Sequence, residues 1–121
     1  MDKRITSKKC LIVTSNVVVG LDLKEIMSQL IAADVHLLKS IEDHWDGTYD
    51  IAFFNISADL LMSDPRIRQM RAAGTTVIVI NGSSPSAILL EAGVLNLAQP
   101  FTSAAVIALL KGCGILPALK F

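Results

Sequence analysis

Short apolar runs recur along the chain and are separated by longer mixed segments. They lie at residues 10–13, 35–38, 51–54, 76–80 and 94–98. Runs this short are typical of strands and most are rich in strand-forming residues. A strand that is apolar on both faces must be covered on both sides, which is the pattern of a parallel sheet between helices. The runs therefore predict an α/β fold with a doubly wound, five-stranded parallel sheet and helices on both faces.

The segments between the runs carry helix signals. After Ser15 and Asn16, apolar residues recur at helical spacing at positions 19, 23, 26 and 30. Asp64 followed by Pro65 is a cap-then-proline start, and Gly74 is a typical helix end. Further helices are expected at residues 40–45, 85–93 and 102–111.

Length and composition limit the kind of protein. With 121 residues, the chain is expected to form a single domain, with its core at about 9–112 and an apolar tail at 113–121. Hydrophobic residues make up 52% and charged residues 18%, which excludes intrinsic disorder. The formal net charge of +0 gives no attraction to nucleic acid, and no run reaches the length of a membrane span. Two cysteines far apart, Cys10 and Cys113, favour a reducing cytoplasm over a disulfide or zinc framework.

Polar residues follow the predicted strands, at the sheet edge where α/β proteins gather their chemistry. Ser15 and Asn16 follow the first strand and Asn55 follows the third. Asn81 follows the fourth strand and Gln99 the fifth. We expect these side chains to share one crevice.

In the order and spacing of these segments, the sequence resembles a known family, the receiver domains of two-component response regulators. The resemblance runs from Lys9 to about Gly112. It rests on residues 11–13 followed by a polar pair, on 49–55, on 76–82, and above all on Glu91-Ala92-Gly93 leading to Ala98-Gln99-Pro100-Phe101. It implies a flavodoxin-like, receiver-type sheet with strand order 2-1-3-4-5.

The departures from the family pattern lie at its functional positions. The acidic pair that binds Mg²⁺ in the family corresponds to Ser15 and Asn16, and the phosphoacceptor aspartate corresponds to Asn55. The switch Ser/Thr corresponds to Asn81 and the lysine before the proline to Gln99. The aromatic switch position corresponds to Asn96, so the resemblance implies a degenerate phosphorylation pocket without its switch.

Physical chemistry makes this set of departures coherent. Mg²⁺ prefers sites that include carboxylates, and an amide is not a phosphoryl acceptor in the way a carboxylate is. A lysine facing no anion would be an unpaired buried cation, so its loss together with the acids is favourable. We expect Gln99, Asn55 and Asn81 to form a neutral hydrogen-bonded cluster, with Mg²⁺ binding absent or weak and no cofactor or metal.

Two predicted helices have more apolar residues than one buried stripe needs. In the family, the surface of the fourth helix, fifth strand and fifth helix is the usual dimer face. We therefore expect a homodimer or a partner there. The residues assigned to this interface are Ile88, Leu89, Val106, Leu109 and Leu110.

The expected function is a receiver-like signalling or adaptor module, not an enzyme, that acts independently of phosphorylation through a protein partner: a histidine kinase, another regulator, or itself. Two alternatives stay open: a working phosphorelay receiver with a non-standard acceptor, and a small-ligand domain of flavodoxin-like architecture. No histidine is placed to activate Ser15, Ser83 or Ser84, and Gly-rich phosphate loops are absent. Arg66, Arg68 and Arg71 are expected to form a solvated face, with an acidic partner surface as the alternative.

Overall fold

Five parallel strands form the single sheet of this computed structural model, which describes residues 9–31, 34–40, 49–56, 58–81, 94–98 and 101–112. The strand order is β2-β1-β3-β4-β5, so the predicted fold class and order are both confirmed. The strands are β1 (Lys9–Val13), β2 (Asp34–Leu38), β3 (Ile51–Phe54), β4 (Thr76–Asn81) and β5 (Leu95–Ala98).

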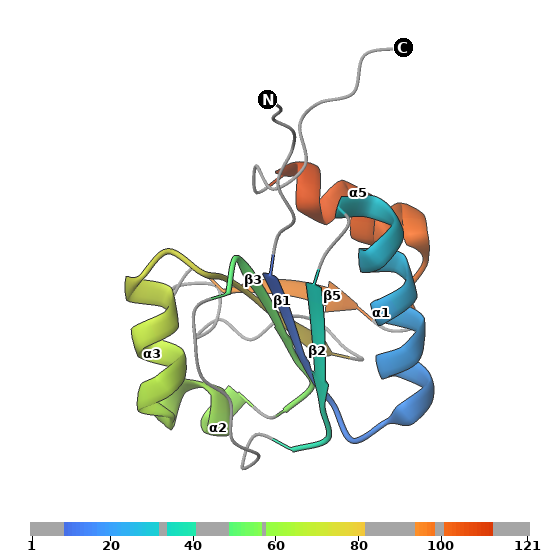
Figure 1. The fold of residues 1–121 in the computed structure, drawn as a ribbon. Helices are drawn as coiled ribbons and strands as arrows, with labels where there is room; N and C mark the ends of the chain where they lie inside the picture. Colours follow the sequence, from blue (N-terminus) through green and yellow to red (C-terminus); the bar gives the residue numbers. More distant parts are fainter. Residues whose placement is uncertain are drawn as a thin grey trace.

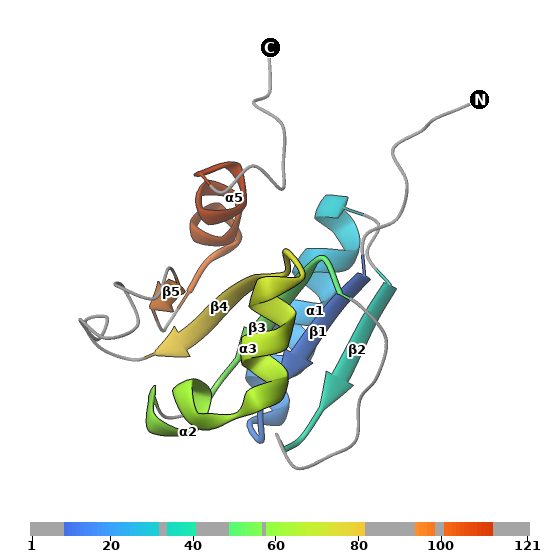
Figure 2. The same cartoon turned by 90° about the vertical axis from the view of Figure 1, so that its left-hand side faces the viewer.

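Helices cover both faces of the sheet. On one side lie α1 (Val17–Ile31) and α5 (Ser103–Gly112), and on the other lie α2 (Ala58–Ser63) and α3 (Pro65–Ala72) (Figures 1 and 2). The six-residue α2 was not predicted, because so short a helix shows no clear periodicity in the sequence. The helices predicted at 40–45 and 85–93, and the tail at 113–121, fall largely or wholly outside the described residues.

Two apolar cores follow from the alternation of side chains along each strand. Toward α1 and α5, the strands contribute Cys10, Ile12, Ile51, Phe53, Ile78, Ile80 and Leu97. Toward α2 and α3, they contribute Leu11, Val13, Ala52, Phe54, Val77 and Val79. All four residues of β3 are buried, as expected for the central strand of a sheet covered on both sides.

The start and end of α3 form as the sequence predicts. The Asp64 carboxylate accepts a hydrogen bond of 2.8 Å from the backbone N–H of Arg66, and Pro65 occupies the first turn. The Arg66 guanidinium also donates to Asp64, at 2.9 Å. After the helix, Gly74 has φ 102°, a left-handed conformation that a residue without Cβ adopts freely.

The packing of α5 corrects the predicted interface. Val106 and Leu110 are fully buried in the core toward α1, and Leu109 is half-buried against the same core. Val106 and Leu110 therefore stabilise the fold of one chain and are not free to contact another, whereas Leu109 keeps part of its surface exposed. The sequence pattern overstated the apolar surface because the exposed apolar residues of α5 are small alanines, at positions 104, 105 and 108. Ile88 and Leu89 lie outside the described residues.

Candidate functional site

Thr14 is the centre of the polar network at the carboxyl edge of the sheet. It follows β1 directly and is buried, with 4% exposure. Its N–H donates to the Leu38 carbonyl at the end of β2, at 2.9 Å. Its Oγ1 accepts from the N–H of Asn16, at 3.1 Å, which forms the local side-chain-to-backbone turn typical of Ser and Thr. Thr14 thus fixes the direction in which the chain leaves the sheet.

Asn55 connects the end of β3 to the same hydroxyl. Its backbone N–H donates to the Val13 carbonyl at 2.8 Å, and its side-chain Nδ2 donates to Thr14 Oγ1 at 3.0 Å. The side chain is half-buried. The ends of β1, β2 and β3 are therefore joined through one threonine.

Asn16 caps the amino end of α1 with its side chain and its backbone carbonyl. Its Oδ1 accepts from the Val19 N–H at 3.2 Å, and its carbonyl accepts from the Gly20 N–H at 3.0 Å. These bonds satisfy N–H groups that the first turn of a helix leaves without partners. Ser15 and Asn16 are both exposed, so the two positions that resemble the metal-binding pair present neutral groups to solvent.

A close approach of helix and sheet brings α1 beside this network. A Cβ atom on Gly20 would lie 2.9 Å from Leu37 Cδ1 and 3.1 Å from Thr14 Cγ2. Contacts under 3 Å require the neighbouring atoms to shift, so the absence of a side chain at Gly20 lets the first half of α1 rest directly on β1 and β2.

The rest of the predicted cluster is only partly described. Asn81 is the last residue of β4 and pairs in register with Ala98 of β5. The side chain of Asn81 and the whole of Gln99 lie outside the described part of the structure. The neutral cluster of Asn55, Asn81 and Gln99 therefore stays a prediction, whereas the bond between Asn55 and Thr14 is observed.

Asn96 occupies a different place from the other polar residues. It pairs with Val79, a residue of the core toward α2 and α3. Its Oδ1 is buried without a hydrogen-bond partner among the residues that the structure describes. An unpaired buried carbonyl of this kind costs about 1–3 kcal/mol.

The described network contains hydroxyls and amides only. Thr14 Oγ1 accepts two hydrogen bonds and keeps one proton to donate, while Asn55 uses its amide nitrogen as a donor. Within the described ranges, no group of three or more His, Cys, Asp or Glu side chains is arranged to hold a metal ion. The network can bind a neutral polar group or a water through hydrogen bonds, and it fixes the geometry of three strand ends.

The sequence pattern led to Ser15 and Asn16 as site residues, and the central role of Thr14, directly before them, was not predicted. The signal was present: a threonine directly after an apolar strand, followed by a serine and an asparagine, is the pattern in which the hydroxyl accepts the N–H two residues on. Burial of that hydroxyl also predicts a second partner, which is Asn55.

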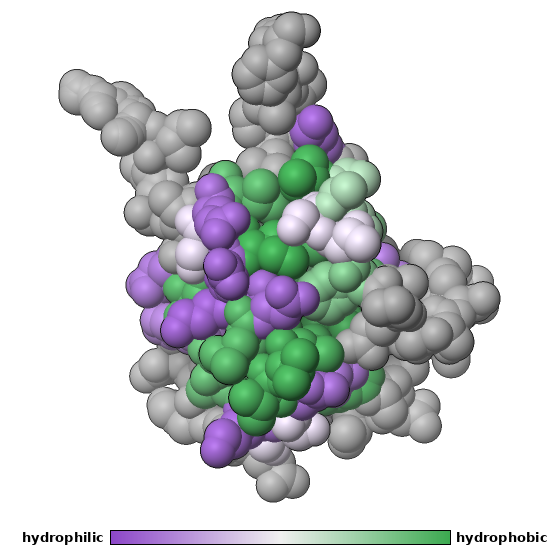
Figure 3. Space-filling view, turned by 90° about the vertical axis from the view of Figure 1, so that its right-hand side faces the viewer, coloured by the Kyte–Doolittle hydropathy of each residue, from purple (hydrophilic) through white to green (hydrophobic). Residues whose placement is uncertain are grey.

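An apolar surface adjoins the network on α1. Val17, Val18 and Leu21 are 60%, 76% and 55% exposed, and Figure 3 shows apolar area on the face that carries α1 and α5. The predicted buried stripe of α1 is confirmed, since Leu23 and Ile26 are buried. The three exposed residues lie off that stripe.

His36 has a partner within the fold. Its Nδ1 lies 2.9 Å from the Tyr49 hydroxyl, and the two rings meet edge to face with centroids 5.5 Å apart. The Asp34 carboxylate is 3.7 Å from Nε2, and Lys9 Nζ lies 5.6 Å from the centre of the Tyr49 ring. This group lies toward the amino edge of the sheet, away from Thr14.

No protein-family model matches the chain, and no curated protein matches it. None of the helices in the described ranges combines the length and apolar character needed to cross a bilayer.

Proposed function

We propose that the chain is a receiver-like signalling or adaptor module of two-component signal transduction. It acts without phosphorylation, through contacts with a protein partner in the cytoplasm. The partner is a histidine kinase, another regulator or a second copy. The observation that carries this proposal is the bond between Asn55 and Thr14 at the carboxyl edge of a 2-1-3-4-5 parallel sheet.

The hydrogen bond from Asn55 to Thr14 supports a structural role for Asn55, whose position corresponds to the phosphoacceptor aspartate of receiver domains. A carboxylate there would be a nucleophile for phosphoryl transfer, whereas an amide whose nitrogen donates a hydrogen bond is not. Ser15 and Asn16 supply oxygen atoms without negative charge, which is a poor set for Mg²⁺. Where a working receiver would bind a metal ion, this chain has hydrogen bonds among the neutral groups of Thr14, Asn16 and Asn55.

The surface of α1 supports an interaction function. Val17, Val18 and Leu21 are large apolar residues exposed beside the network. Contiguous exposed apolar surface is typical of protein contact sites. An adaptor that works through contacts needs such a surface and needs no reacting group.

Acetyl phosphate tests the proposal directly. The purified protein is incubated with acetyl phosphate and Mg²⁺, next to a phosphorylatable receiver as positive control, and its intact mass is measured. We expect no change in mass for this chain and a phosphate adduct for the control. A phosphate adduct on this chain would overturn the proposal in favour of a working receiver with a non-standard acceptor.

A ligand screen tests the remaining alternative. Thermal unfolding is followed with and without flavin mononucleotide, adenine nucleotides and Mg²⁺. A ligand that binds only the folded state raises the midpoint of thermal unfolding. An adaptor that works through protein contacts has no site for these ligands, so we expect the midpoint to stay unchanged. A rise that depends on ligand concentration would instead support a small-ligand domain of flavodoxin-like architecture.

A further inference from the structure

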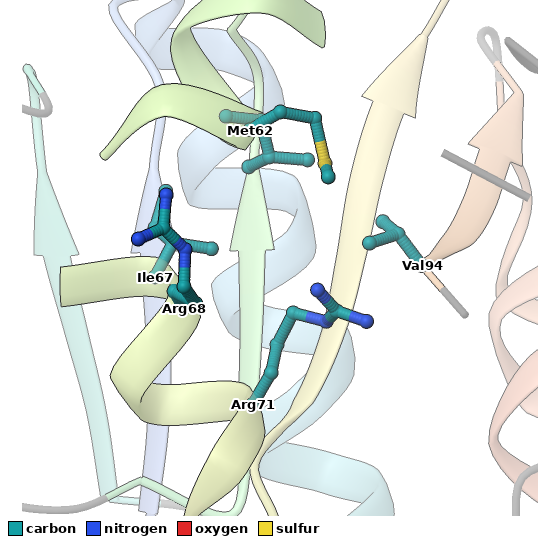
Figure 4. Close-up of a pocket in the computed structure, with 6 residues that line it drawn as sticks. Met62, Ile67, Arg68, Arg71 and Val94 are labelled. Atoms are coloured by element: carbon teal, nitrogen blue, oxygen red, sulfur yellow. The ribbon is translucent and has the colours of Figure 1, made fainter. Parts of the chain in front are cut away.

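A small cavity opens on the face of the sheet opposite α1. Its volume is about 20 Å³, and its lining comes from α2, α3 and the residue before β5 (Figure 4). The lining residues are Leu61, Met62, Ile67, Arg68, Arg71 and Val94. Leu61, Ile67 and Val94 belong to the buried core, so the cavity leads from the surface to the apolar interior.

Two cationic side chains border this apolar cavity. Arg68 is exposed and Arg71 is half-buried, and they lie one helical turn apart on the same face of α3. Neither forms a hydrogen bond or an ion pair with a side chain that the structure describes. Arg66 differs, since its guanidinium is held by Asp64 at 2.9 Å. Among the side chains that the structure describes, Asp64 therefore pairs with one of the three arginines of α3, and the other two border the cavity with no such partner.

The cavity size decides which class of ligand fits. A volume of about 20 Å³ holds one water-sized group. Pockets for small molecules are far larger, at about 300–1,000 Å³, because they enclose most of the ligand. The occupant must therefore insert one small apolar group and leave the rest of itself on the surface, which is how a side chain of a bound peptide behaves.

We propose that this face binds an acidic peptide segment of a partner protein. A methyl group at the end of an apolar side chain of the segment enters the cavity, and carboxylates next to that side chain pair with Arg68 and Arg71. The inference deepens the proposed function by giving the chemistry of the partner and a binding face separate from α1, and it rests on that function only for the existence of a protein partner.

A designed peptide tests the inference on the full chain. The probe is a short fluorescein-labelled peptide with Glu-Leu-Glu between Gly-Ser flanks, and its binding is followed by fluorescence anisotropy. Two control peptides replace the acids by Gln or the Leu by Gly. Exposed ion pairs are individually weak, so we expect modest affinity that falls as salt is added.

Variants of the protein locate the site. We expect Arg68→Gln with Arg71→Gln to weaken binding about tenfold, as two exposed ion pairs in the middle of their usual range of strength predict. The matched control is Lys24→Gln with Lys111→Gln, which removes the same charge from α1 and α5 and is expected to leave binding unchanged. Circular dichroism checks that both variants fold, and the Gln-Leu-Gln peptide tests the charge requirement on the unaltered protein.

Three results would overturn the inference: no binding of Glu-Leu-Glu, equal binding of the Gly or Gln peptides, or equal loss in the two double variants. Each is distinguishable from failure of the proposed function. A phosphate adduct with acetyl phosphate refutes the phosphorylation-independent role and leaves the peptide result standing. A protein partner that binds equally well to the Arg68→Gln, Arg71→Gln variant refutes this site and leaves the adaptor role standing.

Discussion

The side-chain amide of Asn55 donates a hydrogen bond of 3.0 Å to Oγ1 of Thr14, across the carboxyl ends of β1 and β3. The same oxygen accepts the Asn16 N–H at 3.1 Å. One buried hydroxyl therefore holds the end of a neighbouring strand and the start of α1. The carboxyl ends of these strands are therefore held together by hydrogen bonds between neutral groups.

Thr14→Val is expected to lower the free energy of unfolding by about 1–3 kcal/mol, because it leaves the donors of Asn16 and Asn55 without their acceptor. Urea unfolding followed by circular dichroism measures the change. Ser15→Ala, one residue away and exposed, is the control and is expected to stay within about 0.5 kcal/mol of the unaltered protein. Equal effects of the two substitutions would contradict the central role of Thr14.

Asp64→Ala is expected to cost about 1 kcal/mol, since the first turn of α3 loses its capping acceptor and Arg66 loses its ion partner. The same urea experiment checks this value. Asp22→Ala, on the exposed side of α1, serves as the control for removing a carboxylate. If the two variants are equally stable, the cap contributes nothing.

Acid is expected to weaken the fold through Asp64. The Arg66 side-chain hydrogen bond holds the pKa of the Asp64 carboxyl below its usual range, with burial acting in the opposite direction and the Arg66 backbone N–H adding to the lowering. The stabilisation is present above the ordinary Asp pKa of about 3.9 and is lost as the pH falls through the lowered value.

Asp64→Asn separates this charge from the cap, because an asparagine oxygen still accepts the Arg66 N–H. Stability measured between about pH 7 and pH 2 is expected to fall less steeply in the variant than in the unaltered protein. Parallel curves would show that another group causes the acid loss.

Cys10 is expected to resist thiol reagents in the folded protein. Its side chain is fully buried in β1, and burial raises the pKa of the thiol, so little reactive thiolate forms. In a Cys113→Ser variant, which leaves one cysteine, alkylation by iodoacetamide is expected only after urea is added. Rapid labelling without urea would contradict the burial of Cys10.

Leu110→Ala is expected to destabilise the isolated chain by about 2–5 kcal/mol, because it opens a cavity in the core between α5 and the sheet. Leu109→Ala is expected to cost less, since Leu109 is only half-buried. Unfolding at several protein concentrations checks whether the loss belongs to the single chain. A loss that appears only at concentrations where the protein associates would restore Leu110 to an interface.

The strands and most described helices were predictable because each rests on a local signal. Ile51–Phe54 is apolar throughout, and Asp64 with Pro65 begins a helix by the chemistry of its own first turn. The interface assignment of Val106 and Leu110 failed for a non-local reason: which side of α5 is covered depends on how the helix lies on the sheet. The importance of Thr14 also depends on a partner far away in the sequence, Asn55, that only the fold brings near.

The contact between His36 and Tyr49 has a practical consequence. Tyr49 is the only tyrosine of the chain, and its ring touches groups from β1 and β2. Selective isotope labelling of tyrosine would therefore give a single, unambiguous set of ring resonances in a magnetic resonance spectrum. That one signal would report whether the amino edge of the sheet is assembled, without any dye or engineered probe.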